Sequence, residues 1–226
     1  MAKNNTVYLV SNGDFREPAC TAGWPLQSST LAQVKKALKK LGWDTIALPE
    51  YDTKRKHGFL TRQCEGTATF QKIDPEAPVI VVLNIWAYAH HVCGPLQTHR
   101  GPILMLANFD GTWPGLVSLL NHSASLDRLN VKHSRLWTES FSKDPDFMAK
   151  LAEWCKTGTV KHSMAHVTDA AKLKLNGDAE KLGAELAARI KAERRIIGQF
   201  DPGCMGMLNA VMDPAKLGAI GLPIEY

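Results

Sequence analysis

Residues 78–95 read PVIVVLNIWAYAHHVCGP, and this stretch decides the fold. Its apolar run VIVVL (79–83) is continuous, as is the next run along the chain, ILMLAN (103–108). Unbroken apolar runs of this length are typical of parallel strands that helices cover on both faces. The first run is followed directly by four aromatic or imidazole side chains: Trp86, Tyr88, His90 and His91. The sequence therefore predicts two buried central strands, the first of which ends in a polar and aromatic loop.

Short β-rich runs alternate with helical patterns along the rest of the chain. We expect strands near 6–10, 45–48, 79–83, 103–108, 134–137 and 196–200. We expect helices over 28–41, 115–129, 145–157 and 169–195, the last with a break at Asn176 and Gly177. This alternation predicts parallel pairing with right-handed crossovers, and hence an α/β three-layer sandwich with a mostly parallel, flavodoxin- or Rossmann-like sheet.

The composition is that of an ordinary globular protein. The chain has 226 residues, of which 45% are hydrophobic and 22% charged, with a net charge of +5. Its Lys and Arg residues are spread out, which favours a solvated surface and no nucleic-acid partner. The start MAKNNTVYLV has no long apolar segment, and no apolar run reaches the roughly 18 residues of a membrane span. We therefore expect a cytoplasmic protein with no membrane partner. Its 5 Cys residues include no CxxC pair, and we expect them to be reduced thiols.

The sequence contains little evidence of the known motifs for phosphate binding, metal binding or nucleophilic catalysis. Neither GxGxxG nor GxxxxGK[ST] occurs, and no GxSxG marks a nucleophile. DGTWPG (110–115) opens a helix whose free N–H groups could hold a hydroxyl or an anion, or it is only a tight strand-to-helix turn. His162 and His166 have the i, i+4 spacing of a metal pair, but the Glu of HExxH is missing and the segment is predicted as loop or strand. We predict no metal ligands in this chain.

Two longer blocks are more informative together. The first block consists of NIWAYAHH (84–91) followed, after a short gap, by GPILMLANFDGTWPGLVSLLNHSASLDRLNVKHSRLWTE (101–139). The second block is the end of the given sequence, IIGQFDPGCMGMLNAVMDPAKLGAIGLPIEY (196–226). In their joint order and spacing these blocks resemble the N-terminal region of the L-fucose isomerase family, whose relatives include the arabinose isomerases. VSNGDFREPA (10–19) fits the same family more loosely. The resemblance implies an N-terminal α/β domain over 1–194 and, over 195–226, the first βα unit of a second α/β domain that is cut short.

The resemblance also implies an activity. Members of the family are aldose–ketose isomerases that use a manganese-type ion to bind adjacent sugar oxygens while carboxylates move a proton between two carbons. The family's Glu, Asp and His ligands lie further downstream than Tyr226, so we expect this chain to bind no Mn²⁺ and to be inactive alone, as a fragment of a longer enzyme. The alternative is a short protein in which 196–226 folds back on the first domain. The family further implies a small-molecule sugar as ligand, and trimers or hexamers at full length.

The same resemblance gives candidate substrate-binding residues and no catalytic ones. Trp86 matches the family's sugar-facing Trp, and an indole face suits the C–H surface of a sugar, although Trp86 could instead cap the sheet edge. Arg16 matches an Arg in the loop after the first strand, but it could also be a surface residue. Five further candidates follow from their loops at the same sheet edge: Tyr88, His91, Asn108, Asp110 and Trp113. Trp24 and His57 are expected in loops where they could contribute, although His57 and the Gly58-Phe59 next to it could equally form a packing turn. Trp43, Trp137 and Trp154 are expected in the core.

Three functions of different classes stay open. The first is the substrate-side domain of a metal-dependent sugar isomerase. The second is a stand-alone sugar-binding or regulatory module without catalysis. The third is a flavodoxin-like or nucleotide-binding protein, which the missing phosphate loop disfavours.

Overall fold

The computed structural model describes residues 5–174, 176–201 and 204–225. By its contacts the chain divides into two units, and each is described by itself. The first comprises Met1–Lys161 with Met205–Asn209, and the second His162–Cys204 with Ala210–Tyr226. Contacts alone do not define where a domain fold starts, so the predicted boundary between residues 194 and 195 stays a prediction.

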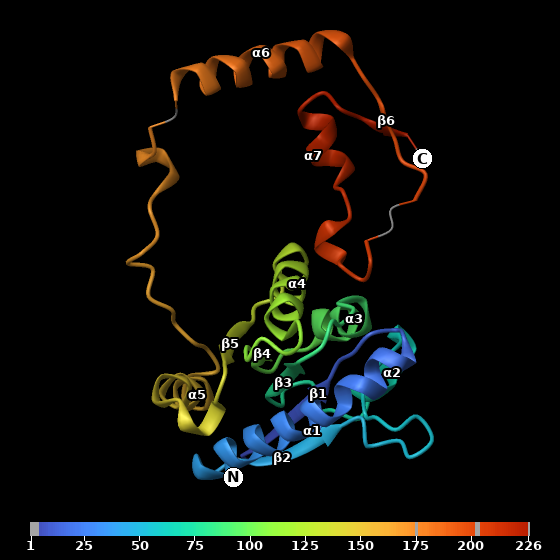
Figure 1. The fold of residues 1–226 in the computed structure, drawn as a ribbon, viewed down its shortest axis with the longest axis vertical. Coiled ribbons are helices and arrows are strands. Elements are labelled where there is room, and N and C mark those ends of the chain that lie inside the picture. The colour runs from blue at the N-terminus through green and yellow to red at the C-terminus, as the bar shows by residue number, and fades with distance from the viewer. Residues whose placement is uncertain (1–4, 175, 202–203, 226) are drawn as a thin grey trace. The chain divides into compact units, whose positions relative to one another are not determined.

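The first unit is an α/β fold around one all-parallel sheet (Figure 1). Its strands are β1 (Thr6–Ser11), β2 (Asp44–Leu48), β3 (Val79–Leu83), β4 (Ile103–Asn108) and β5 (Ser134–Thr138), in the order β2-β1-β3-β4-β5. This is the strand order of Rossmann- and flavodoxin-like folds, and it confirms the predicted fold class. In such sheets ligands bind beyond the carboxyl ends of the strands, at the point where the strand order reverses. Here that point lies between β1 and β3, which pair through Tyr8↔Val79 to Ser11↔Val82.

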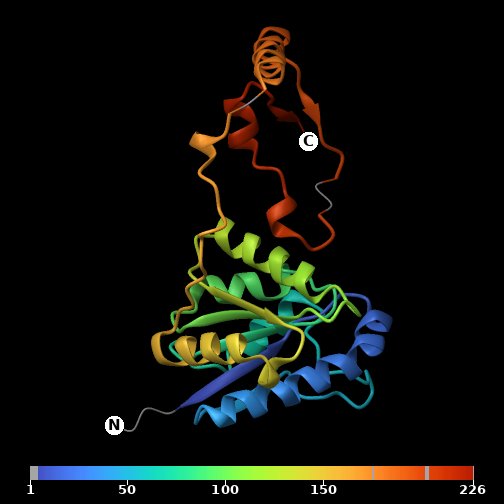
Figure 2. The same ribbon diagram turned by 60° about the vertical axis from the view of Figure 1, so that its left-hand side comes forward.

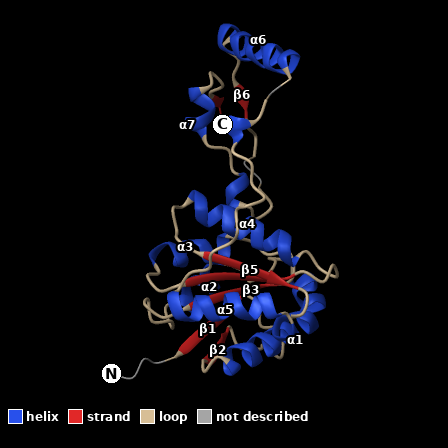
Figure 3. Ribbon diagram, turned by 90° about the vertical axis from the view of Figure 1, so that its left-hand side faces the viewer, coloured by secondary structure: helices blue, strands red, loops and turns tan. Residues whose placement is uncertain are grey.

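Helices cover both faces of the sheet, as Figures 2 and 3 show. The helices of this unit are α1 (Glu17–Lys40), α2 (Gln63–Phe70), α3 (His90–Thr98), α4 (Gly115–Arg128) and α5 (Pro145–Thr157), with a short η1 (Phe141–Lys143). Helices α1 and α5 enclose one core cluster, which includes Leu38, Trp154 and the strand residue Leu104. Helices α3 and α4 enclose the other, in which Leu96 and Leu119 pack with strand residues of the opposite face. All five residues of β3 and all six of β4 are buried, as their unbroken apolar runs predict.

Two features of the helices differ from the sequence-based prediction. Helix α1 begins at Glu17 and not at residue 28. Its first part is missed because Gly23 and Pro25, which usually favour a break, lie inside the helix. Gly23 is needed there, since a Cβ at this position would lie 2.3 Å from Ile85 Cγ2. Helices α2 and α3 were not expected at all. Both are short, and α3 contains Gly94 and Pro95, which read as loop residues.

The tryptophans predicted in the core divide between interior and surface. Trp154 is fully buried and Trp43 packs against the same cluster, as expected. Trp137 is 41% exposed, so its prediction as a core residue is wrong. Strand β5 lies at the sheet edge and buries alternate residues only, with Leu136 pointing inward and Trp137 outward.

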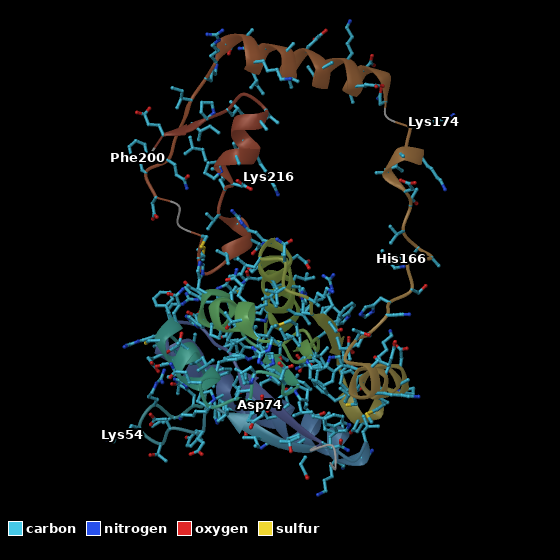
Figure 4. The ribbon with its side chains drawn as sticks, turned by 180° about the vertical axis from the view of Figure 1, so that it is seen from behind. Lys54, Asp74, His166, Lys174, Phe200 and Lys216 are labelled. Carbon is cyan, nitrogen blue, oxygen red and sulfur yellow. The ribbon has the colours of Figure 1, made fainter. Side chains whose placement is uncertain are left out.

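The second unit holds η2 (Ala170–Lys172), α6 (Gly177–Glu193), β6 (Ile197–Gly198), α7 (Pro214–Ala219) and β7 (Ile224–Glu225). Asn176 caps α6 by accepting a hydrogen bond from Asp178 N, which confirms the predicted break. The strand expected at 196–200 is only two residues long and pairs with β7 in a separate parallel sheet. Apolar side chains of this unit stay exposed, and Phe200, labelled in Figure 4, is fully accessible.

Two expectations about individual segments can be compared with the structure. His162 and His166 lie outside any helix, as predicted, and His166 is exposed (Figure 4). None of the helices that the structure describes combines the length and the apolar character that crossing a membrane requires.

Candidate functional site

The loop that follows β3, residues 84–89, is tied to the helices on both sides of the sheet. Ser118 on α4 donates from its Oγ to Ile85 O at 2.6 Å and accepts from Ala87 N at 2.8 Å. Asn121, one turn further along α4, donates from Nδ2 to Ala87 O at 3.1 Å. Because its backbone groups are satisfied by buried side chains, this loop is held in one conformation.

A row of buried amides joins the carboxyl ends of β1, β3 and β4. Gln27 on α1 donates from Nε2 to Ser11 Oγ at 3.0 Å and accepts from Asn84 Nδ2 at 2.7 Å. Asn84 in turn accepts from Asn108 N at 3.3 Å. The hydrogen bonds fix which end of each amide is the donor, so the three strand ends are locked in register with α1.

A second buried chain lies on the other face of the sheet and contains two histidines. His122 Nδ1 lies 2.7 Å from Ser118 O, and since a carbonyl only accepts, this nitrogen carries the proton. Its Nε2 therefore accepts from Asn12 Nδ2 at 2.7 Å, while Asn12 Oδ1 lies 3.3 Å from His91 Nδ1. Burial lowers the pKa of both His91 and His122 to about 4. Both imidazoles are therefore neutral at pH 7 and act as structural hydrogen-bonding groups.

Tyr88 lies over this chain, between two other rings. Its ring centroid is 5.6 Å from that of His91, in a stacked arrangement, and 5.0 Å from that of Phe15. The Tyr88 carbonyl accepts from Asn12 Nδ2 at 2.9 Å. Phe15, in the loop after β1, is 55% exposed, so this aromatic group reaches from the buried histidines to the surface.

The loop after β1 also carries an ion pair. Asp14 is completely buried, and its carboxylate accepts from Arg16 Nε at 3.0 Å and from Arg16 N at 3.0 Å. The guanidinium of Arg16 is exposed, and the hydrogen bond to Asp14 raises its pKa further above the usual value. Arg16 therefore presents an exposed guanidinium, paired with Asp14, at the carboxyl edge of the sheet, and its role as a sugar ligand stays what the family resemblance implies.

The loop after β4 combines polar and aromatic side chains. Asp110 Oδ1 accepts from Thr112 N at 2.9 Å and from Thr112 Oγ1 at 2.6 Å, and these bonds lower the pKa of its carboxyl group. Phe109 is 46% and Trp113 36% exposed, whereas Asn108 is buried. Gly115, which follows, begins α4 so close to the strand ends that a Cβ would lie 2.5 Å from Asn108 O. This geometry favours the tight strand-to-helix turn over an anion site.

Trp86, the strongest candidate from sequence, is half-buried. Its Nε1 is inaccessible to solvent and has no hydrogen-bond partner within the described part of the chain. The indole nitrogen thus points into protein, and any ligand contact would use the carbon surface of the ring. Of the other candidates, Tyr88 and His91 touch one another, and Arg16, Asp110 and Trp113 are accessible. His91 and Asn108 are buried and offer a ligand little surface, and the ligand role of all seven residues stays a prediction.

The sequence-based reasoning missed several residues of this edge. Asn12 and Asp14 follow β1 directly, and Phe109 follows β4, so their positions alone were a usable signal. His57 forms a packing turn, because it is buried, accepts from Phe59 N at 3.1 Å and binds Glu17 Oε2 at 2.6 Å. Trp24 lies inside α1 and not in a loop, so that prediction is wrong, and it packs edge-on against Phe59 with ring centroids 5.3 Å apart.

Two other observations bear on ligands. In the part of the chain that the structure describes, no three His, Cys, Asp or Glu side chains gather so that they could hold a metal ion. The described residues therefore do not fit the Mn²⁺ that the resemblance implies for the family. A cavity of about 460 Å³ lies at the opposite, amino edge of the sheet, where its lining includes Arg100, Lys132 and His133. His133 Nε2, which has no hydrogen-bond partner among the described residues, is inaccessible to solvent, so it does not open into that cavity.

Comparison with models of known protein families finds no match for this chain. No curated protein matches its sequence significantly either. The fold and its carboxyl edge thus define the class, an α/β protein with a flavodoxin-like strand order, and function has to be argued from the site.

Proposed function

We propose that the first unit binds a carbohydrate at the carboxyl edge of its sheet, as the substrate-side domain of a metal-dependent aldose–ketose isomerase acting on a fucose- or arabinose-type sugar. One observation carries the proposal. Exposed rings stand beside hydrogen-bonding and charged side chains on the loops after β1 and β4, at and beside the point where the strand order reverses. The rings are Phe15, Phe109 and Trp113, and the polar groups are Arg16, Asp110 and Thr112.

This combination suits a sugar better than a nucleotide. A pyranose presents apolar C–H faces, which pack on aromatic rings, and a belt of hydroxyls, which pair with carboxylates and guanidinium groups. The row of amides and the ties to α4 hold the three strand ends rigid, so little ordering is required on binding. A nucleotide would need backbone N–H groups around a phosphate, and no glycine-rich phosphate motif is present in the sequence.

Removal of an exposed ring is the direct test of this function. We expect Trp113→Ala to weaken binding of L-fucose or L-arabinose roughly threefold to tenfold, because a ring contact contributes about 1 kcal/mol beyond its burial. Ligand-observed NMR gives the dissociation constant for both sugars. Trp43→Phe, at the amino end of β2, is the matched control and should leave the constant unchanged. Equal affinity in Trp113→Ala, or no sugar binding by the unaltered chain, contradicts the proposal.

A turnover assay separates the isomerase proposal from a binding module without chemistry. We expect the 226-residue chain to convert no aldose to ketose when Mn²⁺ is added, because its described residues supply no metal ligand set. A longer product of the same locus should convert the sugar if the chain is part of an isomerase. Clear turnover by the chain alone would overturn this division of roles, and an inactive longer product would favour the binding or regulatory module.

A further inference from the structure

Residues Met205–Asn209, here called the docking segment, belong to the first unit although they follow some 40 residues of the second. Leu208 packs against the core cluster beneath α3 and α4. Asn209 N donates to Ser125 Oγ at 3.2 Å, and Leu208 O accepts from Arg128 Nη1 at 3.4 Å. The docking segment is therefore attached to α4 by side-chain burial and by hydrogen bonds in both directions.

Gly206 brings the docking segment against the loop after β3. Its carbonyl accepts from Ala89 N at 2.9 Å, which satisfies a backbone N–H at the start of α3 that has no acceptor within the helix. Its backbone also lies on the ring of Tyr88, since a Cβ at this position would be 2.2 Å from Tyr88 Cγ. Gly206 is buried and has a φ of +80°, which L side chains rarely adopt. Both the space and the backbone conformation therefore require glycine.

These contacts determine where Tyr88 lies. The ring of Tyr88 is bounded by His91, by Phe15 and by the backbone of Gly206, while its carbonyl is held by Asn12. His91 and Asn12 are buried and belong to the hydrogen-bonded chain that also contains His122. Of these three neighbours of the ring, the docking segment is the one supplied from outside the sheet and its adjoining loops.

We propose that the docking segment positions Tyr88 and Phe15 for the carbohydrate, so that Gly206 acts as a positioning residue without touching the ligand. The inference rests on the function proposed above. Coupling between two binding events is reciprocal, so a sugar held against Phe15 and Tyr88 should also stabilise the attachment of the docking segment. A short segment that follows the sheet strands in the sequence then affects sugar affinity without itself touching the sugar.

The test compares two glycine substitutions that carry the same backbone penalty. Gly206→Ala places a methyl group in the Tyr88 ring, whereas Gly42→Ala has nearly the same φ, +79°, with nothing within 4 Å of the new Cβ. We expect Gly206→Ala to weaken binding of L-fucose or L-arabinose about tenfold, within the usual range for coupled sites, and Gly42→Ala to leave it unchanged. Hydrogen exchange at the Ala89 amide, measured with and without sugar, reports the docking itself.

The outcomes separate the inference from the function on which it rests. Faster exchange at Ala89 in Gly206→Ala together with weaker sugar binding supports the inference, as does slower exchange in the unaltered chain when sugar is added. Faster exchange with unchanged sugar affinity overturns the inference and leaves the carbohydrate function intact. Absence of sugar binding in the unaltered chain removes both, while exchange at Ala89 still measures the docking. Ser125→Ala removes the acceptor of Asn209 N and should weaken sugar binding and speed exchange at Ala89 as Gly206→Ala does, but by less. This second variant keeps the test valid if Gly206→Ala fails to fold.

Discussion

The free energy of unfolding of the first unit should fall by about 2 kcal/mol for each of His91 and His122 when the pH is lowered from 7 to 5. Burial holds the pKa of each imidazole at about 4, whereas in the unfolded chain it returns to about 6.5. Well above pH 6.5 both states are neutral, and the two groups add no pH dependence. Between pH 6.5 and 4 the unfolded chain binds protons that the native chain excludes, so stability is lost as the pH falls through this window.

Urea unfolding at pH 7 and pH 5 measures this loss. His122→Gln removes one titrating group and should reduce the difference between the two pH values. His166→Gln, at an exposed position outside the first unit, is the control and should not change it. The carboxyl groups of Glu17 and Asp110, whose pKa values are lowered by hydrogen bonds, add their own loss only below about pH 4.5. Equal stability at the two pH values would mean that the histidines are not buried as the structure has them.

Gly66→Ala should destabilise the first unit by about 3 kcal/mol, near the upper end for an overpacked core. Gly66 lies inside α2, where alanine would ordinarily strengthen a helix. A Cβ here would lie 1.7 Å from His91 O, which is a backbone atom at the start of α3 and cannot turn aside as a side chain does. Helices α2 and α3 would have to separate, and the buried chain from His91 to His122 would be disturbed.

The control is another glycine inside a helix. A Cβ added at Gly183, in α6, would have nothing within 4 Å, so Gly183→Ala should leave the first unit unchanged and favour α6 slightly. Thermal or urea unfolding, followed by the near-UV signal of the first unit's tryptophans, distinguishes the two variants. A Gly66→Ala variant as stable as the unaltered chain would show that α2 does not approach α3 as closely as described.

The sequence predicts much of the fold because the deciding signals are local. The apolar runs of β3 and β4 specify buried parallel strands without reference to any other part of the chain. Helix α5 has Pro145 at its start and Gly158 in the left-handed conformation at its end, so its bounds are found correctly. Helix α1 is misjudged where a distant contact overrides local preference, since Gly23 is present to let Ile85 approach.

The candidate site is less accessible to such reasoning. That loops after β1, β3 and β4 meet at one edge follows from the topology, and the sequence predicts it. The topology does not predict which side chains of these loops face outward. Their orientation depends on hydrogen bonds between residues far apart in the sequence, such as Asn12 and His122, which are 110 residues apart. His91 faces inward through such a contact with Asn12, and Asn108 is buried as well, while Phe15 and Phe109 remain outside.

The strand order has a consequence for how the protein is made. Strand β1 is synthesised before the other strands of its sheet, yet one of its two neighbours, β3, begins only at Val79. While β1 and β2 emerge from the ribosome, the side of β1 that will pair with β3 has no partner, and the nascent chain exposes an apolar strand edge for the time needed to translate the intervening segment. Slow translation of residues 49–78 would therefore prolong the interval in which newly made chains can aggregate or recruit a chaperone.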